Sequence, residues 1–142
     1  MSRIYWDTML FIYWLEGNPQ FGKRVDTIFT RMQARNDQLI TGALALGEIL
    51  AGAHKRGADA ERIRKTKLAF EAAVSAVIPF TTETADVYGR IKGSLNIPSA
   101  DAIHLACAAS AGTDLFLTND KNLVGRIIPG IQFIAALDSD II

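Results

Sequence analysis

The sequence predicts a single α/β domain, with a central parallel sheet of about four to five short strands and helices on both faces. Short apolar runs, which suit buried strands, alternate along the chain with longer stretches that have the apolar periodicity of helices. A length of 142 residues and a hydrophobic content of 49% are enough to form one core. We find no linker, internal repeat or low-complexity tract, so residues 1–142 are expected to form one domain.

The first half of the chain predicts two strands and three helices. The strands are expected at 3–6 and 38–41, and the helices from after Asp7 to 15, over 20–35 and through 46–53. The sequence Gly17-Asn18-Pro19 ends the first helix, because glycine and proline interrupt a helical pattern. The third helix follows from apolar residues at the i, i+3, i+4 and i+7 spacing, namely Leu46, Ile49, Leu50 and Ala53. This helix carries Glu48.

The second half predicts three more helices and three more strands. The helices are expected over 59–76, 82–95 and 99–111, and the strands over 77–79, 115–117 and 132–134. Pro98 restarts the chain, and Ser99 is the expected N-cap of the helix that follows. Because strands and helices alternate, the strands are expected to run parallel and to be joined by right-handed crossovers.

Composition restricts the class of protein. Basic and acidic residues balance at 15 each, so the total charge indicates no particular partner. The single cysteine, Cys107, can form no disulfide within the chain and is expected to be a core thiol, as in a reducing cytosol. The apolar run 9–15 is too short to span a membrane and has no basic leader, so a cytoplasmic protein without a membrane partner is expected. Neither a CxxC pair nor a phosphate-binding glycine loop supports a zinc finger or a P-loop.

Four acidic residues fall where a parallel sheet would place functional side chains. Asp7 and Asp120 follow predicted strands, and ligands of open α/β sheets bind beyond the carboxyl ends of the strands. Asp101 falls in the first turn of its helix, where the helix dipole favours an ionised carboxylate. Glu48 lies on a helix of mostly apolar and small residues, where a charge is rarely buried without a partner.

Each of these acids also has a purely structural explanation. Asp7 and Asp120 could cap the helices after them, Asp101 could complement its helix dipole, and Glu48 could lie on the surface. If all four converge, however, their mutual repulsion requires a cation. Mg²⁺ or Mn²⁺ is the natural choice, because such ions prefer oxygen ligands and can activate water beside a phosphodiester. A converged cluster therefore points to phosphodiester hydrolysis.

Four motifs occur in order along the chain: IYWDT at 4–8, TGALALGE at 41–48, SADAIHLA at 99–106 and FLTND at 116–120. Together they resemble the PIN domain family, in its VapC toxin branch, over nearly the whole chain. The resemblance implies a PIN-like, Rossmann-like fold and a metal-dependent endoribonuclease that is the toxin of a toxin–antitoxin pair. By this resemblance the acidic quartet that holds the metal and cleaves RNA is Asp7, Glu48, Asp101 and Asp120, supported by Thr118 and Asn119.

Met9 departs from the family pattern. The family usually has Asn or Ser two positions after its first Asp, and a thioether cannot make the same hydrogen bond. If the usual polar residue orients Asp7 or a metal-bound water, its loss weakens metal binding or activity. A catalytically weakened PIN binding module is therefore the alternative to an active nuclease.

Residues 51–70 carry six basic side chains against two acidic ones, a local net charge of +4. Two interpretations remain open, because such a segment can contact the RNA backbone or can be a solvated helix face. The residues proposed to contact RNA are Arg62, Arg64, Lys65 and Lys67.

Aromatic residues concentrate near the N-terminus, at Tyr5, Trp6, Phe11, Tyr13 and Trp14. They could pack in the core, or they could anchor a homodimer or the groove that binds the antitoxin. Both a homodimer and an antitoxin partner are expected.

Two other kinds of chemistry fit the sequence less well. A signalling receiver domain also binds Mg²⁺ at strand ends. It needs neighbouring acids after its first strand and a lysine after a late strand. In this chain Asp7 is followed by Thr8-Met9, which are not acidic. Metal-free cleavage needs a general base and acid, and only His54 and His104 are available. His104 could reach the site from Asp101, but it is expected to be a histidine satisfied by its neighbours, and His54 is given no role.

Overall fold

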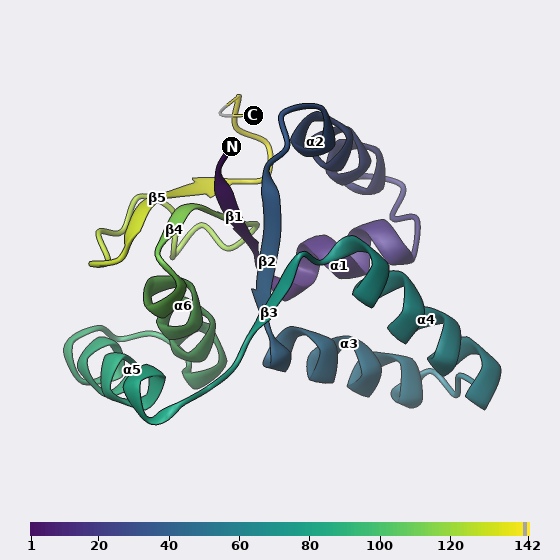
Figure 1. The fold of residues 1–142 in the computed structure, drawn as a ribbon. Coiled ribbons are helices and arrows are strands. Elements are labelled where there is room, and N and C mark those ends of the chain that lie inside the picture. Colours follow the sequence, from purple (N-terminus) through teal and green to yellow (C-terminus); the bar gives the residue numbers. More distant parts are fainter. Residues whose placement is uncertain (141) are drawn as a thin grey trace.

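Five parallel strands form the centre of the molecule, in the order β3-β2-β1-β4-β5 (Figure 1). The computed structural model describes residues 1–140 and 142. The strands are β1 (Arg3–Trp6), β2 (Gln38–Gly42), β3 (Ala76–Ile78), β4 (Thr113–Thr118) and β5 (Ile131–Ala136). The predicted α/β fold with a parallel sheet is therefore confirmed.

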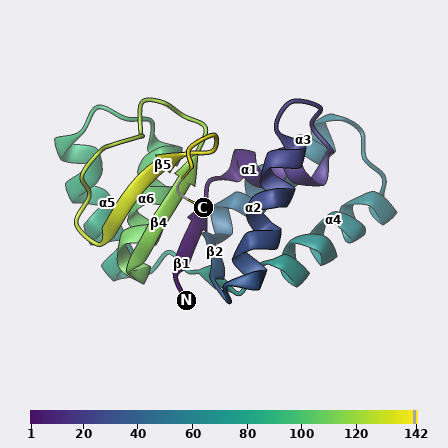
Figure 2. The same ribbon diagram turned by 90° about the horizontal axis from the view of Figure 1, so that it is seen from above.

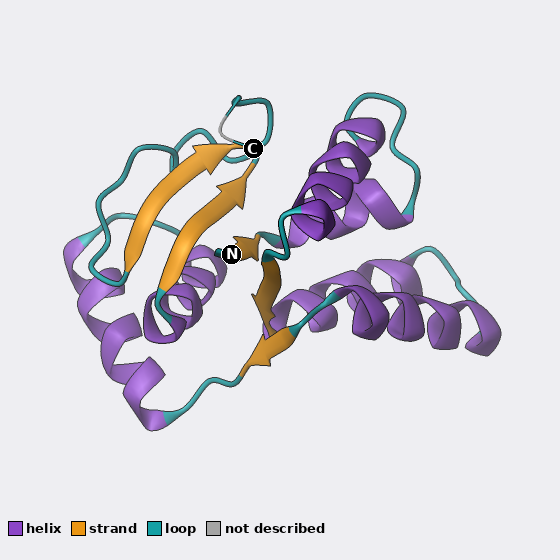
Figure 3. Ribbon diagram, turned by 45° about the horizontal axis from the view of Figure 1, so that its top comes forward, coloured by secondary structure: helices purple, strands orange, loops and turns teal. Residues whose placement is uncertain are grey.

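Six helices in the described residues cover the two faces of this sheet. They are α1 (Thr8–Leu15), α2 (Gly22–Ala34), α3 (Ala43–Lys55), α4 (Ala60–Ala73), α5 (Thr82–Ser94) and α6 (Ser99–Ala111). Figures 2 and 3 show α1 to α4 on one side of the sheet and α5 and α6 on the other.

The alternation of side chains along β1 divides the core into two parts. Ile4 and Trp6 join the core under α1 to α4, whereas Tyr5 joins the core under α5 and α6. Successive residues of a strand point to opposite faces, so a strand with helices on both sides must be apolar throughout. This explains the apolar segments IYW in β1, LI in β2 and LFL in β4.

The order of the strands places a crevice between β1 and β4. From β1 the chain builds outward through β2 to β3, and it then returns to place β4 on the other side of β1. The direction of winding therefore reverses between β1 and β4, which is the point where open α/β sheets bind ligands. Asp7 directly follows β1, and Asp120 follows β4 by two residues.

Three predicted boundaries were wrong. The helix predicted over 59–76 ends at Ala73, because Ala76 pairs with Ile40 and begins β3. The helix predicted from 20 begins at Gly22, because the Asn18 side chain accepts hydrogen bonds from the amides of Gln20 and Phe21 and holds these residues in a turn. Pro98 rather than Ser99 occupies the N-cap position of α6, and no side chain caps that helix.

Cys107 lies on α6 and is buried in the core, as predicted for a core thiol. Burial raises the pKa of its thiol to about 11. Within the part of the chain that the structure describes, no helix combines the length and the apolar character needed to cross a membrane.

Gly130 is the glycine whose replacement we expect to cost most stability. Its φ is +97°, and a Cβ at this position would lie 2.6 Å from the carbonyl oxygen of Ala109. Gly130→Ala is therefore expected to lower the free energy of unfolding by at least about 2 kcal/mol, measured by urea denaturation. Gly89→Ala is the matched control, because a Cβ there meets no atom within 4 Å in α5 and should add about 0.5–1 kcal/mol. Equal stabilities for the two variants would contradict this account.

Candidate active site

The four predicted acids line one pocket of about 410 Å³, at the carboxyl ends of β1 and β4. They come from different elements: Asp7 from the end of β1, Glu48 from α3, Asp101 from the first turn of α6, and Asp120 from the loop after β4. The other residues of the lining are Thr8, Met9, Ile12, Tyr13, His104 and Asn119. The fold thus brings together side chains that lie far apart in the sequence.

Asp7 is buried, and both of its carboxylate oxygens accept a hydrogen bond. Its Oδ1 accepts a hydrogen bond from the Thr8 amide at 2.8 Å, and its Oδ2 accepts one from the Thr118 hydroxyl at 2.8 Å. The residue is the N-cap of α1, as the structural explanation predicted, and it also lines the pocket. Asp7 therefore caps α1 and also takes part in the acidic pocket.

Thr118 connects two of the acids. Its buried hydroxyl donates to Asp7 and accepts a hydrogen bond from the backbone amide of Asp120 at 3.0 Å. Asp120 does not cap a helix, because a turn follows it, and there its Oδ1 accepts a hydrogen bond from the Asn122 amide. Asn119 donates from its side-chain amide to the hydroxyl of Tyr13 at 2.9 Å. The predicted supporting residues therefore hold the walls of the pocket in place.

Glu48 is half-buried and receives two hydrogen bonds on the same oxygen. Its Oε1 lies 2.6 Å from the hydroxyl of Thr8 and 2.7 Å from Nε2 of His104. The hydrogen bond from His104, more than any other interaction, lowers the pKa of Glu48, and the hydrogen bond from Thr8 adds to the effect. Glu48 is therefore ionised at neutral pH.

His104 lines the pocket, a position that the sequence analysis allowed but did not favour. It is buried and satisfied by its neighbours, as expected, but one neighbour is Glu48, an acid of the site. Its other ring nitrogen, Nδ1, lies 2.7 Å from the hydroxyl of Tyr5. The available signal was its spacing of three residues from Asp101, which places both side chains on the same side of α6.

The pocket has an excess of negative charge. The pKa of Asp101 is raised, first by burial and then by repulsion from Asp7 and Asp120. None of the described residues that line the pocket is a lysine or an arginine. A cation would relieve this repulsion.

The donor set fits Mg²⁺ or Mn²⁺ by its chemistry. Carboxylate oxygens are the ligands that these hard cations prefer, and Mg²⁺ usually keeps several waters and binds through one or two carboxylates. Over residues 1–140 and 142, no three His, Cys, Asp or Glu side chains are close enough together to enclose an ion by themselves. The pocket therefore suits a hydrated ion better than a closed cage of protein ligands.

The four basic residues predicted to contact RNA lie outside this pocket. Arg62, Arg64, Lys65 and Lys67 are exposed on α4, which packs against α1 and α3 (Figure 1). Arg64 forms an ion pair with Glu61 at 2.6 Å. His54 is exposed and also lies outside the pocket lining.

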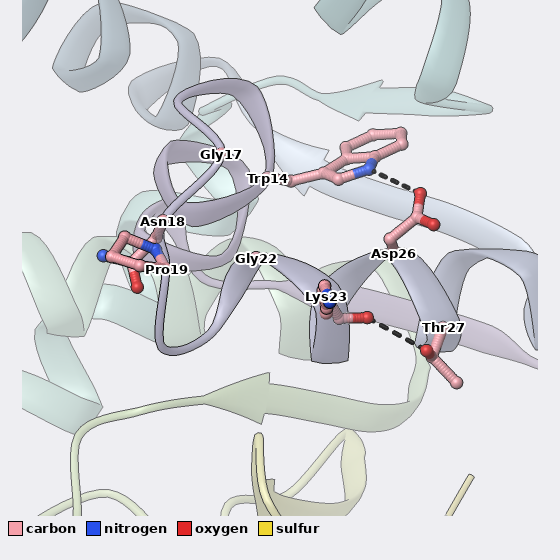
Figure 4. A pocket seen from close by; sticks show the side chains of 8 residues that line it. All are labelled: Trp14, Gly17, Asn18, Pro19, Gly22, Lys23, Asp26 and Thr27. Atoms are coloured by element: carbon pink, nitrogen blue, oxygen red, sulfur yellow. Dashed lines mark hydrogen bonds between the residues drawn. The ribbon is translucent and has the colours of Figure 1, made fainter.

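A second hollow, of about 610 Å³, lies between α1 and α2 beside Trp14 (Figure 4). The Trp14 ring donates from its Nε1 to Asp26 at 3.2 Å and packs on Phe29. Three of the five N-terminal aromatic residues, Tyr5, Trp6 and Phe11, are fully buried in the core. The core explanation therefore holds for these three, and Tyr13 and Trp14 are only half-buried.

Comparison with known proteins gives one family and several solved structures. A family model described as PIN domain matches residues 4–125. The chain is similar to VapBC2 from Rickettsia felis bound to a DNA fragment from their promoter, with a TM-score of 0.73, 16% identity, and coverage of 94% of this chain and 98% of that chain. It is also similar to DNA-bound VapBC from Salmonella typhimurium, with a TM-score of 0.71, 23% identity, and coverage of 96% and 99%.

A third similar structure is VapBC-5 from Mycobacterium tuberculosis, a member of the VapBC family of toxin–antitoxin systems. Its TM-score is 0.57 at 20% identity, with coverage of 94% of this chain and 98% of that chain. The three structures share the fold with this chain. No curated protein sequence gives a significant match. The family match favours the PIN interpretation over a receiver domain.

Proposed function

This chain belongs to the PIN domain family, and from this premise we propose that it is a Mg²⁺- or Mn²⁺-dependent endoribonuclease, the toxin of a toxin–antitoxin pair. The observation that carries the proposal is the convergence of Asp7, Glu48, Asp101 and Asp120 in one pocket. Such a cluster raises the pKa of a member and requires a counterion.

The residues of the pocket would have two roles, to hold the cation and to orient the carboxylates that hold it. Asp7, Glu48, Asp101 and Asp120 would hold the cation. A bound Mg²⁺ or Mn²⁺ would activate the attacking water and stabilise charge on the phosphodiester. Thr118 holds Asp7 and the backbone of Asp120 in fixed positions, and Thr8 orients Glu48. Attack by water, rather than by the 2′-hydroxyl of RNA, would leave 5′-phosphate and 3′-hydroxyl ends.

The first experiment is an RNA cleavage assay with the purified protein. We expect cleavage in Mg²⁺ or Mn²⁺ and none after treatment with EDTA, with activity restored when the metal is added back. Cleavage that persists in EDTA would contradict the proposed metal dependence.

Met9 favours one alternative, a PIN domain that binds its partners but turns over slowly. Its side chain lines the acidic pocket and offers no hydrogen-bond donor there. If Met9 limits activity, Met9→Asn is expected to raise the cleavage rate about tenfold, the lower end of effects from residues that orient metal ligands. Met9→Leu is the control for side-chain size. An unchanged rate in Met9→Asn would argue against the weakened module.

An antitoxin protein is the proposed partner, together with a second copy of the chain. Support comes from the similarity to VapBC structures and from the half-buried Trp14, since exposed aromatic rings often anchor interfaces. If Trp14 anchors an interface, Trp14→Ala is expected to weaken dimerisation or antitoxin binding. Unchanged dimerisation and antitoxin binding would contradict this role.

The basic face of α4 is the proposed binding surface for the RNA backbone. Reversing the charge of Arg62, Arg64, Lys65 and Lys67 is expected to weaken RNA binding and to flatten its dependence on salt, by about 0.7 in the logarithmic slope for each phosphate that the protein no longer neutralises. Binding measured at several salt concentrations tests this. Arg90→Glu, on α5 at the other face of the sheet, is the control. An unaltered slope would show that α4 is a solvated face.

A further inference from the structure

We propose that the acidic pocket also has an apolar wall, formed by Met9, Ile12 and Tyr13 of α1, and that this wall binds a nucleobase of the RNA by stacking on Tyr13. The inference rests on the proposed function, because it assigns the wall to a nucleotide beside the phosphodiester that is cleaved. Binding of a base by itself needs neither metal nor cleavage, so it can be tested separately.

The apolar wall follows from the spacing of residues along α1. Ile12 and Tyr13 lie three and four positions after Met9, so the three side chains share one face of the helix. All three line the same pocket as the four acids, and Asp7 at the start of this helix is one of those acids. The carboxylates and the apolar wall therefore border one common space.

Contacts on two sides hold Tyr13 in place. Its ring packs on Phe21, with centroids 4.8 Å apart and planes 33° from parallel. Its hydroxyl accepts the hydrogen bond from Asn119, the residue before Asp120. The side chain is only half-buried, so part of it remains open to a ligand. A ring that is fixed before binding loses little entropy when a base stacks on it.

The volume of the pocket leaves room for more than an ion. An octahedral ion with six waters fills roughly 200 Å³, at about 30 Å³ for each water. The pocket measures about 410 Å³, a size at which pockets hold small organic ligands, mainly through apolar and aromatic side chains. A nucleotide suits both parts of the lining, because its phosphate can join the cation while its base contacts the apolar wall.

Stacking also explains how an acidic pocket can hold a polyanion. The described residues that line it include no lysine or arginine, so the pocket has no cationic side chain of its own for the phosphates. Stacking on an aromatic ring accepts every base, because each base has a π face. The bases of a duplex are stacked on their neighbours, whereas unpaired bases are free to reach a ring. We therefore expect the pocket to take unpaired RNA with little preference for sequence.

The test is saturation-transfer NMR of adenosine with the metal-free protein. We expect the base protons of adenosine to receive more saturation than its ribose protons, and ribose 5-phosphate, which has no base, to receive none. Tyr13→Leu keeps an apolar side chain but removes the flat ring, so it should weaken adenosine binding at least about fivefold. Tyr88→Leu on α5, where the tyrosine is also half-buried, is the matched control and should bind adenosine like the wild type.

Two further variants make the result specific to the ring. Tyr13→Phe keeps the ring and should retain most of the binding, whereas Tyr13→Met lacks a flat ring and provides the same test if Tyr13→Leu does not fold. No saturation of the adenosine base, or equal binding by wild type and a folded variant without the ring, would overturn the inference even if the protein cleaves RNA. The apolar wall would then be left to the antitoxin. Adenosine binding at Tyr13 without RNA cleavage in Mg²⁺ would instead count against the proposed function and leave the base site standing.

Discussion

Asp101→Asn is expected to lower RNA cleavage at least about 100-fold while it makes the metal-free protein more stable. Replacing residues that merely orient metal ligands costs about 10–100-fold, so removing a charged ligand should cost at least as much. Single-turnover cleavage rates in Mg²⁺ measure the first effect, and thermal unfolding in EDTA measures the second.

The gain in stability follows from the raised pKa of Asp101. Burial and the neighbouring acids Asp7 and Asp120 raise this pKa, so the ionised carboxylate destabilises the folded state at neutral pH. The group is partly solvated, which limits the gain to about 1 kcal/mol or less, or roughly 1–4 °C in the unfolding midpoint. The pKa of Asp101 is higher in the folded than in the unfolded state. The destabilisation by the ionised carboxylate is therefore present at neutral pH and disappears as the pH falls below the ordinary pKa of Asp. The difference between wild type and variant should therefore vanish in acid.

Asp86→Asn is the control for this variant. Asp86 is exposed on α5 and pairs with Arg90, so its replacement should change stability by less than about 0.5 kcal/mol and leave cleavage unchanged. Loss of stability in Asp101→Asn, or retention of full activity, would show that Asp101 is not part of a strained metal-binding cluster.

Thr118→Val should give the second large effect, because one hydroxyl supports two acids. Valine has nearly the same shape, but it can neither donate to Asp7 nor accept from the amide of Asp120. We expect the cleavage rate to fall about 10–100-fold and the free energy of unfolding to fall about 1–3 kcal/mol. Thr118→Ser keeps the hydroxyl and should retain most of the activity.

Thr113→Val separates stability from function. Thr113 is also buried on β4, and its hydroxyl donates to the carbonyl of Ala108 at 2.7 Å, far from the pocket lining. This variant should lose a similar amount of stability and keep its activity. If Thr113→Val and Thr118→Val lost activity equally, the effect would be one of stability, and Thr118 would have no special role.

Sequence reasoning predicted the architecture because the information was local. The central strands have short apolar segments, Asp7 directly follows β1 and Asp120 follows β4 by two residues, so parallel strands bring these acids to one edge. The predicted resemblance to the PIN domain family is confirmed by the match over residues 4–125. The pocket contains all four predicted acids, although their proposed roles in metal binding and cleavage remain predictions.

The network behind Glu48 could not be predicted in the same way. Its members, Gly42, Tyr5 and His104, are joined only by contacts between distant parts of the chain. Tyr5 had two open explanations, the core or an interface, Gly42 was given no role of its own, and His104 was expected to be a histidine satisfied by its neighbours. The end of the helix predicted over 59–76 was missed for a related reason, because pairing of Ala76 with β2 overrides helical propensity.

The most direct test of the central claim is to map the ends of the RNA fragments produced by the wild-type protein in Mg²⁺. Hydrolysis at the acidic pocket predicts 5′-phosphate and 3′-hydroxyl ends, formed only when the metal is present and lost in Asp101→Asn. Fragments with 2′,3′-cyclic phosphates would mean that the 2′-hydroxyl attacks, and they would contradict metal-dependent hydrolysis by the four carboxylates.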